Sequence, residues 1–251
     1  MRSGMYLGNC AAAGSPAFSP KSIAGLQAWW DPSNLATITS SGGLASAIAD
    51  LSGNGYTAAN ADSAHQPQTG AAAVNGLNVL TQNGGGNSAL LLSGAGLSLG
   101  DSLTQFSYGF IYEPSGSGIL LFISASAGGA FFRISMYAAT SFFTGFFDES
   151  DNIFQSGLSL ASGASFCLVI YDGATFTFRV NGAQVFAKAA SGSGTGATPS
   201  TVVSLGAQYT GASYSSPYGG LIGEGVFYNV AFTPTQVGLL EAYISNKWKV
   251  F

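Results

Sequence analysis

The second half of the chain alternates apolar and polar residues, which predicts β-strands. The clearest case is 105–113, where aromatic residues take every second position: Phe106, Tyr108, Phe110 and Tyr112. Because successive side chains of a strand point to opposite faces, we expect these rings on one buried face. Residues 119–124 form a continuous apolar run, and 131–137 alternate again. The pattern is typical of an antiparallel sheet.

Residues 165–189 predict three strands joined by two tight turns. The turns are marked by two dipeptides whose residues tolerate a positive φ: Asp172-Gly173 and Asn181-Gly182. With two residues in each turn, Phe178 pairs with Cys167 on one side and with Val185 on the other. Both pairings put the same residues of the middle strand on the apolar face, so the two turns are mutually consistent.

The end of the chain carries a helical pattern. Its apolar residues recur every three or four positions and form one stripe: Val237, Leu240, Ile244 and Trp248. Thr233 is the predicted N-cap, Pro234 the first helical residue, and Gln236 completes a capping box. We expect Lys247 and Lys249 at the carboxyl end to interact with the helix dipole.

Composition changes the picture mainly through charge. Only 7% of the 251 residues are charged, while 47% are hydrophobic and 36 are glycine. A chain of this length can form one all-β domain with a substantial core. The net charge of −4 and the scattered basic residues argue against a nucleic-acid partner. No run of 18 apolar residues occurs, so we predict no membrane insertion. A surface of uncharged polar groups suits an assembly or an extracellular location.

The first 20 residues predict an N-terminal arm rather than part of the core. They are rich in Ala, Gly, Ser and Pro, and we expect them to dock onto a neighbouring subunit. Residues 7–10 resemble a lipoprotein cleavage site, but the apolar stretch before them is too short for a signal peptide. The two cysteines, Cys10 and Cys167, are not a disulfide framework, and Cys167 is the more typical buried thiol.

Two segments resemble the opening and closing segments of a concanavalin A-like (laminin-G-like) β-sandwich. The opening segment is 22–32 followed by 50–56, and the closing segment is 220–229 followed by the helix. The resemblance covers roughly residues 20–249, and the most similar variant occurs in bacteriophage structural and fibre proteins. It implies an all-β, two-sheet antiparallel jelly-roll sandwich with a short C-terminal α-helix, here as one domain over 21–251. Lectins, hydrolases and structural modules share this fold, so function must be argued from a site.

The carboxylates predict no enzyme. Glycan hydrolysis needs two of them across the bond, and the Glu-x-Asp-x-x-Glu strand signature of the related glucanases is absent. Asp148, Glu149 and Asp151 are expected in a solvated turn. Glu224 lies in an apolar strand and is expected to make a structural hydrogen bond to a loop. His65, the sole histidine, is interpreted as an ordinary loop residue because no Gly-x-Ser-x-Gly elbow accompanies it.

One segment imitates half of a calcium loop. Asp50, Ser52 and Asn54 have the spacing of the first ligands, but Ala61 stands where the loop's closing twelfth-position Glu belongs. Asx-rich turns also bond their own backbone, which is the competing interpretation. The family resemblance implies calcium at a rim in some relatives, so calcium stays open as a cofactor.

Aromatic residues supply the candidate glycan site. The segment 208–219 combines Tyr, Ser and Gly, a composition typical of binding loops, and its tyrosines are the predicted contacts: Tyr209, Tyr214 and Tyr218. Trp30 is a further candidate, although in this signature one residue of the Trp29-Trp30 pair should be core and the other should cover a sheet edge. The same composition also builds inert fibre surfaces.

The sequence therefore favours a non-enzymatic bacteriophage virion surface protein, either a head or tail fibre or a decoration module. It would be assembled in the host cytoplasm as a homo-oligomer, bind other virion proteins through its arm, and present a candidate site for host-cell glycan. Two alternatives stay open: a secreted bacterial carbohydrate-binding module, and a polysaccharide depolymerase.

Overall fold

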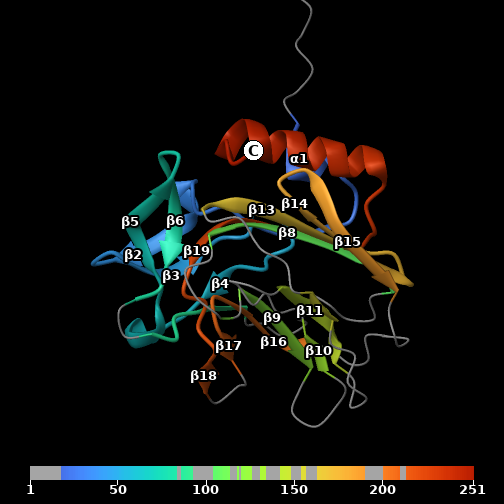
Figure 1. The fold of residues 1–251 in the computed structure, drawn as a ribbon. Helices are drawn as coiled ribbons and strands as arrows, with labels where there is room; N and C mark the ends of the chain where they lie inside the picture. The colour runs from blue at the N-terminus through green and yellow to red at the C-terminus, as the bar shows by residue number, and fades with distance from the viewer. Residues whose placement is uncertain are drawn as a thin grey trace, which may run out of the picture.

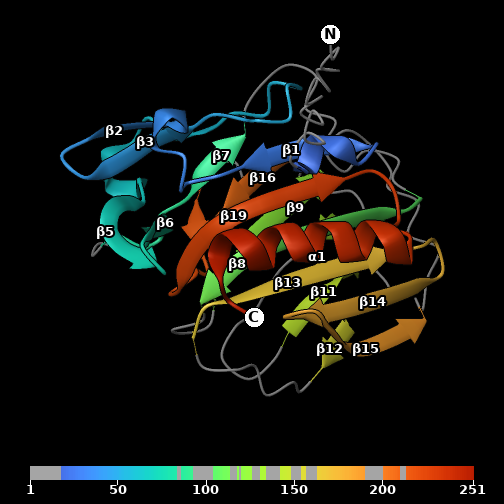
Figure 2. The same cartoon turned by 90° about the horizontal axis from the view of Figure 1, so that it is seen from above.

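The computed structural model describes residues 18–83, 86–92, 104–113, 118, 120–125, 131–133, 142–147, 154–156, 163–189, 200–209 and 213–251, and the statements below concern these residues (Figure 1). The described part is mainly β-strand, with α1 (Pro234–Trp248) lying across one face of a sheet (Figure 2). None of its helices is long and apolar enough to cross a membrane. The predictions made for Cys10, Asp148, Glu149 and Asp151 concern residues outside the described ranges.

Fourteen strands join one continuous antiparallel sheet that doubles over into two layers. Its main path runs β15-β14-β13-β8-β19-β6-β5-β3-β4-β7-β16-β9. The strands of this path and its two side strands are β1 (Leu26–Trp30), β2 (Ile38–Ser41), β3 (Leu44–Ile48), β4 (Ala58–Ala59), β5 (Gln68–Val74), β6 (Leu77–Thr81), β7 (Leu90–Leu92), β8 (Phe106–Glu113), β9 (Leu121–Ala125), β13 (Ser165–Tyr171), β14 (Thr175–Val180), β15 (Ala183–Ala189), β16 (Ser200–Leu205) and β19 (Leu221–Tyr228).

Shorter elements complete the described chain. The additional strands are β10 (Phe131–Arg133), β11 (Phe142–Phe147), β12 (Phe154–Ser156), β17 (Gln208–Tyr209) and β18 (Tyr214–Ser215). Three 3-10 helices are present: η1 (Pro20–Ser22), η2 (Leu35–Thr37) and η3 (Ser63–His65). The predicted antiparallel sandwich with a C-terminal helix is confirmed.

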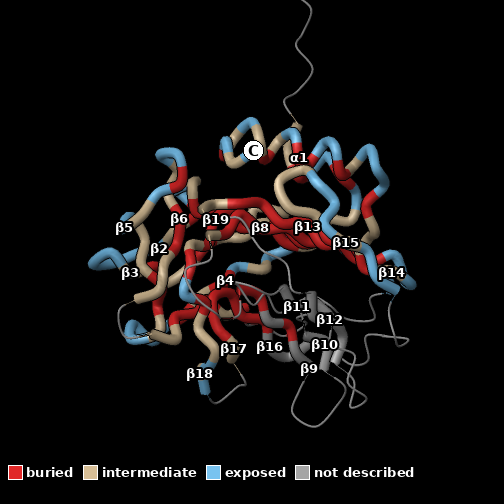
Figure 3. Tube along the Cα trace, in the orientation of Figure 1, coloured by how far each residue is buried: buried red, intermediate tan, exposed pale blue. Residues whose placement is uncertain are grey.

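The sandwich has two cores, one on each side of the β8 layer. The inner core lies between the two layers and contains the four rings of β8 that the alternation predicts on one face: Phe106, Tyr108, Phe110 and Tyr112. Ile111 points the other way, into the outer core beneath α1. Figure 3 shows the central strands buried and α1 exposed on its outward side. The period of two in this strand is therefore confirmed.

Cys167 belongs to the inner core, as its apolar strand predicts. Its side chain is fully buried, and its thiol donates to the Phe110 carbonyl at 3.6 Å. Burial raises the pKa of this thiol to about 12. A thiol held in this state has little nucleophilic thiolate near neutral pH.

The predicted pairing of β13 with β14 is wrong by two residues. Phe178 lies opposite Val169 rather than Cys167. The reason is the Asp172 side chain, which accepts from the amides of Ala174 and Thr175 at 2.9 and 2.7 Å. Together with the bond from the Asp172 amide to the Thr175 carbonyl at 3.2 Å, these bonds close the turn between Asp172 and Thr175, so the turn lies one residue later than predicted. A shift of two keeps each side chain on its face, and Phe178 is buried as expected.

The pairing of β14 with β15 begins as predicted and then shifts by one. Asn181 and Gly182 have φ of 49° and 79°, as a tight hairpin turn requires. A bulge between Phe178 and Arg179 then moves Phe178 opposite Phe186 instead of Val185. The bulge turns Phe186 against the inner core and leaves Val185 40% exposed.

Helix α1 begins as predicted. Thr233 accepts from the Gln236 amide, and the Gln236 side chain accepts from the Thr233 amide at 2.8 Å. The predicted apolar stripe is buried in the outer core. Lys247 lies in the last turn as expected, but its ammonium group bonds Glu224 on the sheet. Lys249 is the C-cap residue, in a left-handed conformation.

The described chain starts inside the predicted arm. Phe18 packs edge-to-face on Tyr243, with ring centroids 5.8 Å apart. The Tyr228 hydroxyl donates to the Pro20 carbonyl at 2.9 Å. Phe18 and Pro20 therefore contact the sandwich, and the rest of the arm lies outside the described residues.

Candidate binding site

Glu224, on β19, stands at the centre of a buried polar cluster. It accepts four hydrogen bonds from β1 and α1, of 2.7 Å or 2.8 Å each; the donors are Trp29 Nε1, Tyr243 Oη, Lys247 Nζ and Trp248 Nε1. The predicted structural role thus involves β1 and the helix, not a loop. Burial and the charge of Asp31 raise the pKa of Glu224, while Lys247 and Trp248 act in the opposite direction.

The pair formed by Glu224 and Asp31 is unsuited to hydrolysis. Lys247 Nζ lies between the two carboxylates, 2.7 Å from Glu224 and 2.5 Å from Asp31. The carboxylate side chains are only 0% and 7% exposed, so no glycosidic bond can reach between them. The cluster fastens β1, β19 and α1 together.

The calcium candidate does not fit a cation. The carboxylate of Asp50 accepts from the amides of Trp29, Ser52 and Tyr56 and from the Ser52 hydroxyl. Asn54 turns its amide nitrogen toward the carbonyls of Leu26 and Gln27. Donors occupy the positions that a cation would need, so the loop is a self-bonded Asx turn. In the described part of the chain, no group of three or more His, Cys, Asp or Glu could hold a metal.

Two of the four predicted glycan contacts are buried. Trp30 is 2% exposed, and its indole donates to the Tyr56 carbonyl at 2.7 Å. Tyr218 is 0% exposed, and burial raises the pKa of its hydroxyl. Neither ring exposes a face to a sugar, because both rings are packed in the inner core. Trp29 covers the outer core instead, which matches the predicted division of the tryptophan pair.

The other two tyrosines come together at the β17–β18 hairpin. Tyr209 lies opposite Tyr214, with ring centroids 4.6 Å apart. Tyr214 also stacks on His65, with centroids 4.0 Å apart and planes 21° from parallel. The Tyr214 hydroxyl accepts from Asn60 Nδ2 at 3.0 Å. Partial burial raises the pKa of Tyr214, and the Asn60 bond acts against this rise.

His65 is therefore more than an ordinary loop residue. Its Nδ1 lies 3.2 Å from the Asn87 carbonyl, and its Nε2 lies 3.8 Å from Asp62. Nothing in the local sequence around His65 signals the stack, because its partners come from a hairpin far along the chain.

We call His65, Tyr209 and Tyr214, with Asp62 and Ser215 at their rim, the tyrosine–histidine patch. The three rings are half-buried, and both rim residues are exposed. Figure 1 places the β17–β18 hairpin on the side of the sandwich opposite α1. Aromatic rings with a polar rim can combine apolar contact with hydrogen bonding, as carbohydrate surfaces require.

Comparisons with known proteins agree with the fold. The chain is similar to domain 4 of a GH43 extracellular arabinanase from Geobacillus stearothermophilus in complex with arabinotriose, at a TM-score of 0.60 and 15% identity over 86% of this chain and 98% of that domain. A Trypanosoma rangeli sialidase is similar at a TM-score of 0.58 and 13% identity over 93% of this chain, which spans only 35% of the sialidase. Identities this low show the fold alone.

Sequence comparison identifies the family. No curated protein matches the chain. The model of the concanavalin A-like lectin/glucanases superfamily matches residues 84–238. These residues include β8, most of the inner core and the start of α1. The chain therefore belongs to the concanavalin A-like lectin/glucanase superfamily.

Proposed function

We propose that this protein is a non-enzymatic surface protein of a bacteriophage virion, a head or tail fibre or a decoration module, that adheres to host glycan through the tyrosine–histidine patch. The observation that carries the adhesive role is the stacking of Tyr214 on His65 beside an exposed polar rim. The phage context rests on the sequence resemblance of the opening and closing segments.

The chemistry of the patch suits weak, neutral contacts. Rings of this kind bury apolar area at low conformational cost, and the rim offers hydroxyl and carboxylate groups to a sugar. Individually weak contacts become useful when many copies act together, as on a virion. The low charge of the whole chain favours such an adhesive surface over one that recognises ionic partners.

The environments of the acidic residues support a non-enzymatic role. Glu224 and Asp31 are committed to Lys247, and Asp50 is committed to its own turn. A depolymerase that used Glu224 would have to dismantle the attachment of α1 before substrate could reach the carboxylate.

The alternative is a secreted bacterial carbohydrate-binding module. The likeness to the arabinanase domain in complex with arabinotriose, over 86% of this chain, favours this class. The mass of the mature protein distinguishes the virion hypothesis from the secreted-module hypothesis, because a secreted module would have lost its leader. A mature mass that retains residues 1–20 counts against secretion.

Binding to an immobilised glycan array that includes arabinotriose tests adhesion. We expect saturable binding that is lost when both Tyr209 and His65 are changed to Ala. Leu35→Ala, which shortens a 64% exposed apolar side chain on η2, is the control and should bind as the wild type does.

The salt dependence of binding tests the chemistry of the contact. Neutral contacts should change little between roughly 50 and 200 mM salt, a range over which phosphate-binding proteins lose orders of magnitude in affinity. A steep loss would mean that ionic contacts carry the binding, and it would overturn the proposed mechanism.

A further inference from the structure

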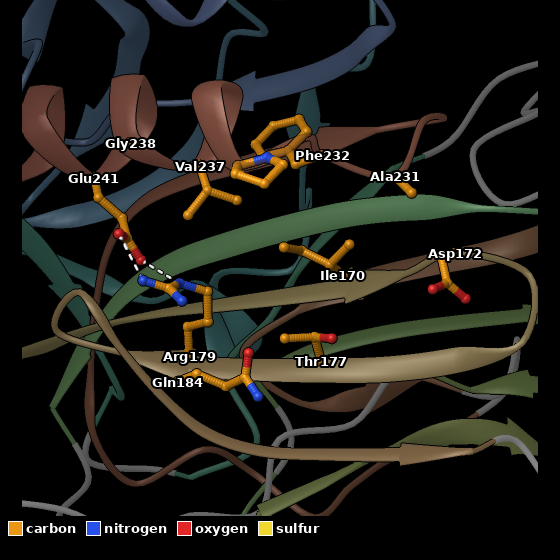
Figure 4. A pocket seen from close by; sticks show the side chains of 11 residues that line it. Ile170, Asp172, Thr177, Arg179, Gln184, Ala231, Phe232, Val237, Gly238 and Glu241 are labelled. Atoms are coloured by element: carbon orange, nitrogen blue, oxygen red, sulfur yellow. Dashed lines mark hydrogen bonds and ion pairs between the residues drawn. The ribbon is translucent and has the colours of Figure 1, made fainter.

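A groove lies on the outer face of the sheet, between β13–β15 and the first turns of α1 (Figure 4). Its cavity volume is about 390 Å³, within the range of small-ligand sites. Its lining includes Ile170, Thr177, Arg179, Gln184, Val237 and Gly238. The groove and the tyrosine–histidine patch lie on opposite sides of the sandwich.

One end of the groove is held by a fixed ion pair. Arg179 Nε and Nη2 donate to the two carboxylate oxygens of Glu241 at 2.7 and 3.0 Å. The pair joins β14 to α1 and cancels its own charge. Figure 4 shows Asp172 at the other end of the groove, where its carboxylate leaves a net charge of one negative unit. An anionic ligand is therefore disfavoured.

The polar groups between these ends have unused hydrogen-bonding capacity. Within the described residues, no side-chain hydrogen bond engages Thr177 or Gln184, and both side chains line the cavity. Asp172 uses its Oδ1 atom for the β13–β14 turn. A hydroxyl group, an amide and a carboxylate oxygen thus face the same space as possible partners of a ligand.

The apolar lining comes from both the sheet and the helix end. Ile170 on β13 is 8% exposed and lies beside its cross-strand partner Thr177, while Phe232, just before α1, and Val237, in its first turn, are 7% and 8% exposed. Figure 4 shows Val237 reaching toward the groove from the helix and Ile170 from the sheet. A ligand that lies here meets apolar side chains from the helix and the sheet, with hydrogen-bonding groups beside them on the sheet.

Gly238 has no packing reason to be glycine. A Cβ added at this position would meet no atom within 4 Å, yet glycine inside a helix costs about 1 kcal/mol relative to alanine. Gly238 is exposed and lines the cavity, so a long side chain at this position has room to reach into the groove.

We infer that this groove is a second binding site, for an uncharged ring ligand that is rich in hydroxyl groups, such as a mono- or disaccharide unit. The apolar side chains of Val237 and Ile170 contact the carbon face of the ring, and Thr177, Gln184 and Asp172 bond its hydroxyl groups. This inference rests on the proposed function, since it gives the adhesive protein a second contact on the other side of the sandwich.

NMR of the full chain, with methyl and aromatic signals recorded together, can test the two sites separately. The methyl groups of Ile170 and Val237 report on the groove, while the aromatic ring signals of Tyr209 and Tyr214 report on the patch. The probes are glucose, galactose, N-acetylglucosamine and arabinotriose. We expect saturable shifts of the groove methyls with at least one of them.

Gly238→Leu should fill the groove and weaken this binding about tenfold or more. Because the substitution removes a helix-interior glycine, the melting temperature should not fall, and this confirms that the variant is folded. Gly238→Ala is the matched control, with a small effect on binding. Gln184→Ala removes a hydrogen-bonding group without filling the space and should weaken binding less than Gly238→Leu.

The outcomes separate the two proposals. Groove shifts that Gly238→Leu abolishes support the second site, and they do so whether or not the patch also responds. Shifts confined to Tyr209 and Tyr214 overturn the groove and leave adhesion through the patch intact. Shifts confined to the groove place the glycan contact there and overturn the patch. Shifts at neither site with any of the four probes overturn both proposals.

Discussion

Two clusters of aromatic and polar side chains lie on opposite sides of the sandwich. They contain similar residue types, but one joins secondary-structure elements and the other is partly exposed. At the Glu224 cluster, each carboxylate oxygen accepts two hydrogen bonds, from tryptophan, tyrosine and lysine donors. At the tyrosine–histidine patch the rings stack on one another while their rim stays exposed. Residue type alone does not separate the two.

The difference lies in how completely the polar groups are used. A buried polar group must find its hydrogen-bond partners inside the protein. A cluster in which every buried polar group has a partner therefore holds its elements together. A half-exposed cluster meets part of its hydrogen-bonding capacity with water, and a ligand can replace that water. The first cluster should therefore govern stability and the second should govern binding.

Glu224→Ala should have the largest effect on stability. It leaves Asp31 as the only carboxylate bonded to Lys247 and removes the acceptors of the Trp29 and Trp248 indoles. Removing one member of a buried ion pair typically costs about 3–5 kcal/mol, and we expect a loss of that size in the free energy of unfolding. Urea denaturation followed by tryptophan fluorescence measures it.

Asp62→Ala is the matched control for that loss. It removes a carboxylate whose side chain is 59% exposed and that caps η3 by accepting from the Ala64 amide, so the free energy of unfolding should fall by only about 1 kcal/mol. Equal effects of the two substitutions would contradict the division between a stabilising Glu224 cluster and a binding tyrosine–histidine patch.

Asp50→Ala should cost less, about 2 kcal/mol, because it leaves three backbone amides to find water in a partly buried turn. Asp50→Asn keeps an acceptor oxygen and should recover part of the loss. Thermal unfolding with calcium or with chelator should give the same midpoint, since the turn does not fit a cation. A midpoint that rises with calcium and falls with chelator would restore the calcium interpretation.

Local physics explains what the sequence could predict. The alternation in β8 and the capping box of α1 depend on neighbouring residues, and both hold. The β13–β14 register fails because one side chain, Asp172, selects the turn through bonds that the dipeptide rule ignores. Even there the buried face is right, since a shift of two residues preserves it.

The two clusters could be predicted only in part, because their members meet across long stretches of chain. Trp29 and Glu224 are 195 residues apart, and Asn60 and Tyr214 are 154 apart. An acidic residue in an apolar strand signals that Glu224 must have partners, but not which ones. His65 carries no such signal. The three tyrosines of the segment 208–219 stand in similar local sequence, yet packing places Tyr218 in the core and leaves Tyr209 and Tyr214 half-buried.

Tyr214→Phe should have a small effect on stability, and it sharpens the comparison most. The substitution keeps the stack on His65 and removes only the hydroxyl that accepts from Asn60, whose amide nitrogen still donates to the Ala89 carbonyl at 2.8 Å. The expected loss in the free energy of unfolding is about 0.5–1 kcal/mol. Glycan binding should persist in this variant and disappear in Tyr214→Ala, because the ring supports the patch. Loss of binding in both variants, with the fold retained, would mean that the hydroxyl contacts the glycan directly and that the Asn60 bond positions it.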